Sequence, residues 1–404
     1  MALALAGSIA NSFTEWMHIS GYISVACPGV GYAVGPGRQS MGFETWFSVY
    51  WALGSGMVNV LVTGGCGFIG SALLRHLLSN DEFDGKVMNV DKLTYAANPR
   101  SVASVENDDR YSFERIDIAD LEAVERTIGS FEPDIIIHLA AETHVDRSIE
   151  DPFDFVKTNV LGTSHLLHCS LERAHANPGF RFIHVSTDEV YGSMQDGESA
   201  KEGDPYRPNS PYAASKAASD HMVRAWHSTY GMPVITTNCT NNYGPWQYPE
   251  KLIPVMVLNA LKGSPLPVYG DGGNVRDWLY VEDHASAIWR VACGGQIGET
   301  YNISGRAELT NLELVRTICS ELDESIPRAD GKSYSTQIEL VADRPGHDRR
   351  YSLDSEKIER ALEWRPSLSF EAGLRQTINW YIDHEEELTK STESAFATRR
   401  GLIR

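Results

Sequence analysis

A glycine-rich segment between a strand pattern and a helix pattern is the feature that most constrains this fold. The strand pattern covers residues 58–63, and Thr63-Gly-Gly-Cys-Gly-Phe-Ile-Gly70 then leads into helical spacing over residues 71–78. In a parallel α/β sheet, such a tight turn aims the N–H groups of the helix start at a dinucleotide pyrophosphate. The residues expected against that cofactor are Gly64, Gly67, Phe68, Ile69 and Gly70.

The alternation of strand and helix patterns continues after Met57. Strand patterns lie at residues 58–63, 86–91, 112–116, 134–139, 180–186 and 233–239. This order predicts an α/β fold with a Rossmann-type, doubly wound parallel sheet. After residue 244 the segments become shorter and richer in Pro and Gly. We therefore expect a cofactor-binding domain with the catalytic residues at 57–244, mainly a smaller C-terminal substrate-binding region at 245–390, and a tail at 391–404.

The first 56 residues do not follow this pattern, because they hold three charged residues and no sustained period of 2 or 3.6. We interpret them as a disordered leader, or as a sign that the natural start is Met57; an added contact or anchoring segment is the alternative. No apolar run reaches the roughly 18 residues of a membrane span, and the start lacks the basic residues of a signal peptide. The six cysteines form no C-x-x-C pair, which favours a reduced, cytoplasmic protein.

The charge of the chain bears on its partners. Its 54 acidic and 35 basic residues give a formal net charge of −19. This charge repels a phosphate backbone, so we do not expect nucleic acid as a partner. Lysines are few, and a Lys-poor acidic surface suits high salt, where self-repulsion is screened. The composition is compatible both with a halophilic protein and with an ordinary acidic one.

The end of the second strand pattern indicates which dinucleotide binds. Asp91 stands there, 21 residues after Gly70, where its carboxylate can accept hydrogen bonds from the adenosine ribose and would repel a 2′-phosphate. We therefore expect NAD rather than NADP, although Asp91 could also be a strand-end turn residue. Residues at two further strand ends are expected to face the adenine and the phosphates: Asp117, Ile118, Leu139, Ala140 and Ala141.

Chemistry is expected where the fifth strand pattern ends. Thr187, Asp188 and Glu189 place a hydroxyl and two carboxylates at that strand end, although such a turn is by itself more often a helix cap. Two adjacent carboxylates suggest an acid and a base with separated pKa values. Tyr212 and Lys216 share one helix face, so the ammonium can lower the pKa of the phenol. Together these residues predict a base for the oxidation of an alcohol by hydride transfer.

From residue 57 to about 385 the chain resembles the extended short-chain dehydrogenases/reductases, and most closely the dTDP-glucose 4,6-dehydratase family. The supporting stretches are residues 91–95, 138–148, 186–192, 241–245, 249–254, 274–284 and 343–350. The Thr187-Asp188-Glu189 triplet is the most specific. Related epimerases usually have no Asp-Glu pair there, while GDP-mannose dehydratases and UDP-glucuronate decarboxylases carry the Glu without that Asp.

The resemblance implies a redox-neutral dehydration of dTDP-glucose. Tyr212 would remove the C4 hydroxyl proton while NAD takes the C4 hydride, and Thr187 would hydrogen-bond the same oxygen. Glu189 would then remove the C5 proton as Asp188 protonates the leaving C6 hydroxyl, after which the hydride returns to C6. The segments 153–172 and 212–230 look like long amphipathic helices, and the family implies that such helices pair across a homodimer as a four-helix bundle. Their apolar stripes could instead merely pack on the sheet.

Further site residues carry over from the family pattern. The additional cofactor contacts are Lys92, Leu93, Thr94, Thr158 and Asn242, together with Tyr212 and Lys216. The substrate contacts are Thr143, Thr187, Asn241, Lys251, Leu252, Pro267, Tyr269, Arg276, Asn311, Asp343 and His347. Structural readings stay open, since Asn241 could brace a turn and Arg276 could pair with Asp277 or Glu282. No metal site is expected, because no second ligand is suitably spaced from His284 or His347.

Two other functions stay open. The first is another nucleotide-sugar epimerase, decarboxylase or dehydratase of the same superfamily, against which Asp188 argues. The second is a non-catalytic NAD-sensing module. A sensor needs no such residues beyond its cofactor contacts, so the joint presence of five residues argues against it: Thr187, Asp188, Glu189, Tyr212 and Lys216.

Overall fold

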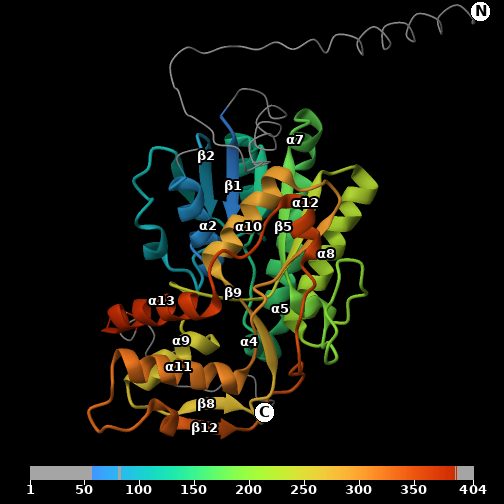
Figure 1. The fold of residues 1–404 in the computed structure, drawn as a ribbon. Helices are drawn as coiled ribbons and strands as arrows, with labels where there is room; N and C mark the ends of the chain where they lie inside the picture. The colour runs from blue at the N-terminus through green and yellow to red at the C-terminus, as the bar shows by residue number, and fades with distance from the viewer. Residues whose placement is uncertain (1–56, 81–82, 387, 389–404) are drawn as a thin grey trace, which may run out of the picture. The chain divides into compact units, whose positions relative to one another are not determined.

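The computed structural model describes residues 57–80, 83–386 and 388 (Figure 1). The predictions for the leader at 1–56 and for the tail at 391–404 lie outside the described residues. Among the described residues, no helix combines the length and the apolarity that crossing a lipid bilayer requires.

Seven parallel strands form the central sheet, in the order β10-β6-β5-β4-β1-β2-β3. Their bounds are β1 Asn59–Thr63, β2 Lys86–Val90, β3 Tyr111–Glu114, β4 Ile135–His138, β5 Arg181–Thr187, β6 Val234–Cys239 and β10 Thr300–Ile303. The first six coincide with the predicted strands, and the doubly wound α/β fold is confirmed. The seventh, β10, was not predicted; it extends the sheet by pairing with β6.

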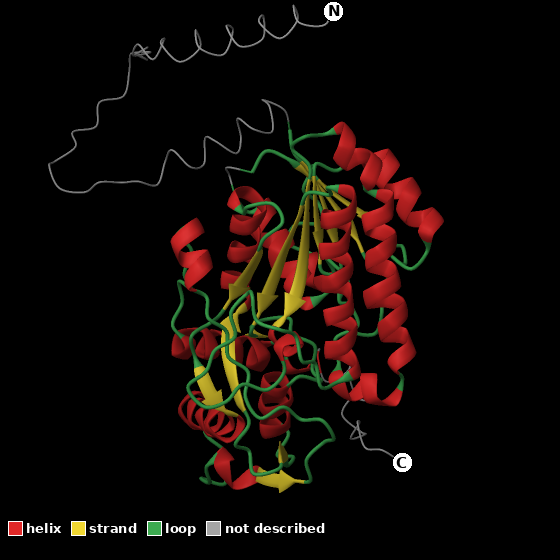
Figure 2. Cartoon of the chain, turned by 90° about the vertical axis from the view of Figure 1, so that its right-hand side faces the viewer, coloured by secondary structure: helices red, strands yellow, loops and turns green. Residues whose placement is uncertain are grey.

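Helices cover both faces of this sheet, as Figure 2 shows. Side chains along the inner strands alternate between two hydrophobic clusters: in β1, Val60 and Val62 belong to one and Leu61 to the other. The first cluster includes α2 (Phe68–Leu78) and α10 (Val281–Gly294). The second includes α3 (Leu121–Phe131), α6 (Thr163–Cys169) and α8 (Pro211–Tyr230). Both faces are therefore buried, as a parallel sheet requires.

A smaller part faces the carboxyl ends of the strands (Figure 1). It contains a three-stranded sheet of β11 (Glu308–Thr310), β9 (Val275–Tyr280) and β7 (Asn241–Tyr243), and the pair β12 (Ile338–Val341) and β8 (Leu266–Tyr269). Its helices α9 (Leu252–Leu261), α11 (Asn311–Ser325) and α13 (Phe370–Asp383) share a third hydrophobic cluster. The chain after residue 244 contributes to both parts, because α10 and β10 return to the large sheet while α12 (Glu356–Leu362) contacts β10.

The segment expected as one helix over 153–172 is divided. The segment contains α5 (Pro152–Phe155), a π turn at Val156–Gly162, α6 and the start of α7 (Leu171–Ala176), and α4 (Val145–Glu150) precedes it. Inside the π turn, the Asn159 side chain accepts from Glu142 N at 2.9 Å and donates to Glu142 O at 3.0 Å and to Ser215 Oγ at 2.8 Å. The turn thus ties a cavity-lining loop to α8, a tertiary contact that helical periodicity does not reveal. Short 3₁₀ turns occur at Pro99–Val102, Asp188–Tyr191 and Tyr334–Gln337.

Candidate active site

The glycine-rich loop between β1 and α2 packs against the end of β4. Gly64 has φ +75°, and a Cβ there would lie 2.7 Å from Ala140 N. A Cβ on Gly70 would lie 2.2 Å from Gly64 O, so neither position accepts a side chain without movement. Gly67 forms the N-cap of α2 without a side-chain cap, which leaves the first N–H groups of the helix for an anionic group.

Asp91 closes the other side of this loop. Its carboxylate accepts hydrogen bonds from Cys66 N at 2.9 Å and from Leu93 N at 2.7 Å. Burial raises the pKa of Asp91, and these two backbone hydrogen bonds oppose that rise. The buried carboxylate thus has a fixed orientation at the end of β2, where lone pairs not used by these bonds can accept from a ribose diol.

A cavity of about 300 Å³ runs along the carboxyl ends of the strands. It brings together nearly all the residues predicted to contact the cofactor: Gly64, Gly67, Phe68, Ile69, Gly70, Asp91, Lys92, Thr94, Asp117, Ile118, Leu139, Ala140, Ala141, Thr158, Tyr212, Lys216 and Asn242. Leu93 does not line the cavity. Its backbone N–H instead donates to the Asp91 carboxylate, which does line it. Lys92 forms a 2.8 Å ion pair with Asp117 across the cavity rim.

A second cavity of about 390 Å³ adjoins the first. Thr143, Glu189, Asn241, Glu250 and Lys251 line both cavities, so Glu189 stands where they meet. The other predicted substrate residues in the second cavity are Leu252, Pro267, Tyr269, Arg276, Asn311 and His347. Thr187 lines only the first cavity, and Asp343 lines neither; its Oδ1 lies 2.6 Å from His347 Nδ1 and orients that ring.

Asp188 is buried at the end of β5. Thr187 Oγ1 donates to its Oδ1 at 3.1 Å, while its Oδ2 has no hydrogen-bond partner among the described residues. Burial, with a smaller contribution from the negative charge of Glu189, raises the pKa of Asp188 to about 8. The carboxyl group is therefore mostly protonated at neutral pH and can act as an acid.

Glu189 has a different environment, although it is the next residue. Burial raises its pKa, but the positive charges of Arg344, Arg276 and Lys251 oppose that rise. The Tyr351 hydroxyl approaches Glu189 Oε2 at 3.5 Å. The two neighbouring carboxyl groups thus differ: burial keeps Asp188 protonated, while the cations around Glu189 favour its ionised form. Such a pair can add a proton at one atom of a substrate and remove one at the next.

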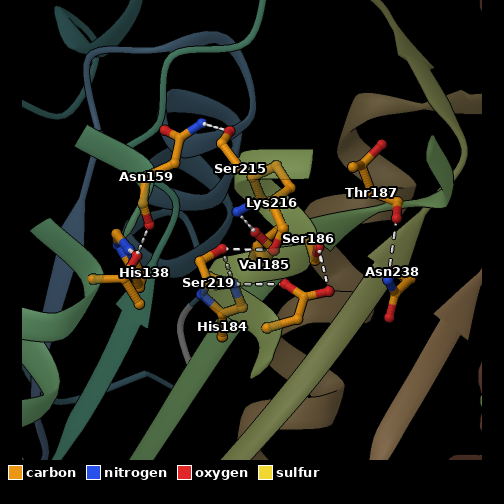
Figure 3. A network of polar contacts seen from close by, with 12 residues as sticks. His138, Asn159, His184, Val185, Ser186, Thr187, Ser215, Lys216, Ser219 and Asn238 are labelled. Atoms are coloured by element: carbon orange, nitrogen blue, oxygen red, sulfur yellow. Dashed lines mark hydrogen bonds and ion pairs between the residues drawn. The ribbon is translucent and has the colours of Figure 1, made fainter. Parts of the chain in front are cut away.

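Tyr212 and Lys216 occupy one face of α8, as predicted, but the pKa of the phenol does not follow the expectation. Burial, and then the negative charge of Glu189, raise the pKa of Tyr212 well above its ordinary value, while a hydrogen bond with Thr187 opposes the rise. The expected lowering by Lys216 does not prevail, because the ammonium donates instead to Val185 O at 2.9 Å (Figure 3). Tyr212 is therefore protonated in the ligand-free protein.

Some residues of the two cavities were not predicted from the sequence. Arg344 lines the second cavity and forms a 2.9 Å ion pair with Asp146. Glu250 lines both cavities and lies 3.4 Å from Arg147 Nε. Arg344 lies inside the 343–350 stretch, and Glu250 directly precedes Lys251. Both could therefore have been predicted from their position next to predicted site residues in the sequence.

Known proteins resemble this chain over most of its length. The sequence profile of the family described as GDP-mannose 4,6 dehydratase matches residues 61–377. A dTDP-glucose 4,6-dehydratase of Escherichia coli (strain K12) is 51% identical over 354 residues, which cover 84% of this chain and 97% of the relative. That of Haemophilus influenzae is 53% identical over 334 residues, covering 81% and 98%. The chain belongs to the dTDP-glucose 4,6-dehydratase family.

Solved structures agree with this membership, which confirms the predicted family. The dTDP-glucose 4,6-dehydratase from Streptomyces venezuelae, solved with NAD bound, superposes with a TM-score of 0.76 at 47% identity, covering 83% of this chain and all of that one. A UDP-glucose 4-epimerase from Thermus thermophilus, also solved with NAD, gives 0.71 at 31% identity, covering 80% and 99%. The identity to the dehydratase is thus higher than the identity to the epimerase.

Proposed function

We propose that this protein is an NAD-dependent hydro-lyase that converts dTDP-glucose to dTDP-4-keto-6-deoxyglucose. The observation that carries the proposal is the pair of adjacent carboxyl groups at the end of β5. Burial keeps Asp188 protonated, whereas three cations oppose the protonation of Glu189. An elimination of water needs such an acid and base next to each other, and an epimerisation needs neither.

The first cavity fits NAD. The uncapped start of α2 would hold the pyrophosphate, Asp91 the adenosine ribose, and Lys216 the nicotinamide ribose. Asp91 would repel the 2′-phosphate of NADP, which supports NAD as the cofactor. Bound NAD supplies a reversible hydride acceptor next to the sugar.

The residues around that cofactor divide the proton transfers among them. Tyr212 takes the C4 hydroxyl proton, with Thr187 hydrogen-bonded to the same oxygen. Since Tyr212 is protonated in the ligand-free protein, its deprotonation accompanies assembly of the loaded site, with the Lys216 ammonium one helical turn away as the compensating charge. The C4 ketone acidifies the C5–H bond; Glu189 removes that proton, and Asp188 protonates the C6 oxygen, which leaves as water. Return of the hydride to C6 and of the Glu189 proton to C5 would then complete the 4-keto-6-deoxy sugar.

The second cavity would hold the nucleoside diphosphate. Arg276 is held there by hydrogen bonds to Val275 O at 2.7 Å and Asp348 O at 3.0 Å, and its guanidinium stacks on the Tyr351 ring at 4.2 Å. These two bonds use only two of its five N–H donors, so a fixed guanidinium still has donors for a pyrophosphate. Lys251 and Asn241, at the junction of the cavities, would contact the same group.

Two further proposals concern assembly and location. Phe153, Val156 and Leu161, on α5 and the π turn, expose 79%, 52% and 46% of their surface, an apolar patch that supports a homodimer. The five described cysteines are free, which supports a location in the reducing cytoplasm.

A Glu189→Gln variant tests the proposed reaction. The amide keeps the size of the side chain but cannot take the C5 proton, so the variant should bind dTDP-glucose and NAD while its rate of water loss falls by at least about 100-fold. Mass spectrometry follows the loss of water, and calorimetry follows binding. The matched control is Glu125→Gln on the exposed face of α3, which should behave as the wild type. Normal product formation by Glu189→Gln would overturn the proposal.

A further inference from the structure

Helix α8 is joined to strand β5 at three consecutive strand positions. The Asp220 carboxylate lies 3.0 Å from His184 Nε2 and accepts from Ser186 Oγ at 2.8 Å. Between these two residues, Val185 O accepts from Lys216 Nζ at 2.9 Å. Figure 3 shows Lys216 reaching the strand amid this network. All these side chains are buried, so the contacts form away from water, directly before Thr187 and Asp188.

Asp220 stands one helical turn beyond Lys216 and two turns beyond Tyr212. Its position on the same face of α8 places its carboxylate beneath the cofactor cavity, which both Lys216 and Tyr212 line. Asp220 itself does not line the cavity. Any effect it has on the reaction must therefore act through these neighbours.

Other titratable groups also surround the Lys216 ammonium, and they are neutral. Burial, and then Lys216, lower the pKa of His184 to about 4, so the imidazole is neutral. Burial raises the pKa of Cys239 to about 12 and that of Tyr206 as well, so the thiol and the phenol are also neutral. Burial lowers the pKa of the His138 ring, which is neutral too. Among the described residues, the Asp220 carboxylate is thus the group whose negative charge opposes the fall in the pKa of the buried ammonium.

We propose that Asp220 is a positioning residue: its carboxylate is the buried counter-charge that keeps the Lys216 ammonium at the cofactor cavity and holds the end of β5 from which Thr187 and Asp188 project. The inference rests on the proposed function, because it assigns a role in the same site. A purely structural brace would need only hydrogen bonds, and an amide could supply most of them. The charge of Asp220 is the feature that separates the two roles.

An Asp220→Asn variant removes this charge and keeps the shape of the side chain. Without its counter-charge, the buried Lys216 should lose its proton at a lower pH, because burial lowers its pKa and Asp220 opposes that fall. The variant should bind NAD about tenfold more weakly near pH 8, the loss expected for one hydrogen bond from a charged donor. The pH at which NAD affinity falls should move down by about one unit. The kcat for dTDP-glucose should fall by at least about tenfold with KM within about threefold.

Ser219→Ala is the matched control, because Ser219 is an uncharged neighbour that also contacts His184, at 3.2 Å. It should leave the pH dependence of NAD binding unchanged. If Asp220→Asn folds poorly, thermal melting provides a second test. The double variant Lys216→Met/Asp220→Asn removes both charges, so it should melt at a higher temperature than Asp220→Asn alone.

Three outcomes would overturn the inference: an unchanged pH dependence of NAD binding in Asp220→Asn, the same shift in Ser219→Ala, or no recovery of melting temperature in the double variant. NAD binding needs no sugar substrate. A wild type that binds NAD but leaves dTDP-glucose unchanged would therefore overturn the proposed function. The pH dependence of NAD binding would still test the proposed role of Asp220.

Discussion

Replacing Asp188 with Asn should make the protein more stable and less active at the same time. The pKa of this carboxyl is raised from 3.8 to about 8, mainly by burial. Between those values the unfolded chain has an ionised carboxylate there, whereas the folded chain must hold a proton. Folding therefore takes up a proton in this window, and stability falls as pH rises from about 4 to about 8. Asn stays neutral at every pH, so the stability of the variant lacks this loss between pH 4 and pH 8.

The size of the effect follows from the shift. At pH 7 the gap from the ordinary pKa is about three units, and each unit corresponds to about 1.4 kcal/mol, which sets an upper limit of roughly 4 kcal/mol. Asn still buries a polar group, so we expect about half of that limit, a rise in melting temperature of roughly 3–6 °C. Water loss should slow by at least about 100-fold, because an amide cannot protonate the C6 oxygen.

Thermal melting of the wild type and Asp188→Asn across a pH series measures this difference. The difference should be small at pH 4, grow up to about pH 8 and level off above it. Asp109→Asn, at an exposed carboxylate, is the control and should show no such growth. A variant that melts below the wild type at pH 7, or a difference that does not depend on pH, would refute the conclusion that Asp188 is buried as a neutral acid.

Three further predictions concern the cofactor loop, the assembly and the surface. Gly70→Ala should weaken NAD binding by at least about tenfold in calorimetry, because its Cβ would meet Gly64 O at 2.2 Å; Gly129→Ala in α3, where nothing lies within 4 Å, should bind NAD normally. Phe153→Glu should convert a dimer to a monomer in sedimentation velocity, and an unchanged mass would count against the apolar patch as the interface. If the acidic surface is a halophilic adaptation, the melting temperature should rise between low and molar KCl; a flat response contradicts that reading.

The sequence predicted the elements whose packing is local and periodic. Val60, Leu61 and Val62 alternate between the two hydrophobic clusters, which is the pattern that indicated a strand. Strand β10 has only four residues, Thr300–Ile303, and its membership in the sheet depends on pairing with β6, a contact between segments far apart in the sequence. Helical spacing likewise does not show that a π turn interrupts residues 153–172.

The sequence predicted which residues form the site better than it predicted their pKa values. Motif spacing placed the cofactor residues at strand ends, and the topology of the sheet gathers them into one cavity. The pKa of Tyr212 depends on burial and on Glu189, which come from other elements, and so the expected lowering by Lys216 was wrong for the ligand-free protein. The contacts of Asp220 and Arg344 likewise arise only when α8 meets β5 and when residues 343–350 meet α4.

A product assay on the full chain tests whether the protein eliminates water from a thymidine-linked glucose. The protein with NAD is incubated separately with dTDP-glucose, UDP-glucose, GDP-mannose and UDP-glucuronate, and the products are identified by mass spectrometry and NMR. We expect dTDP-glucose alone to lose one water and give the 4-keto-6-deoxy sugar, without net formation of NADH. Inversion at C4 with no change of mass, or tight NAD binding with no turnover of any of the four sugars, would contradict it.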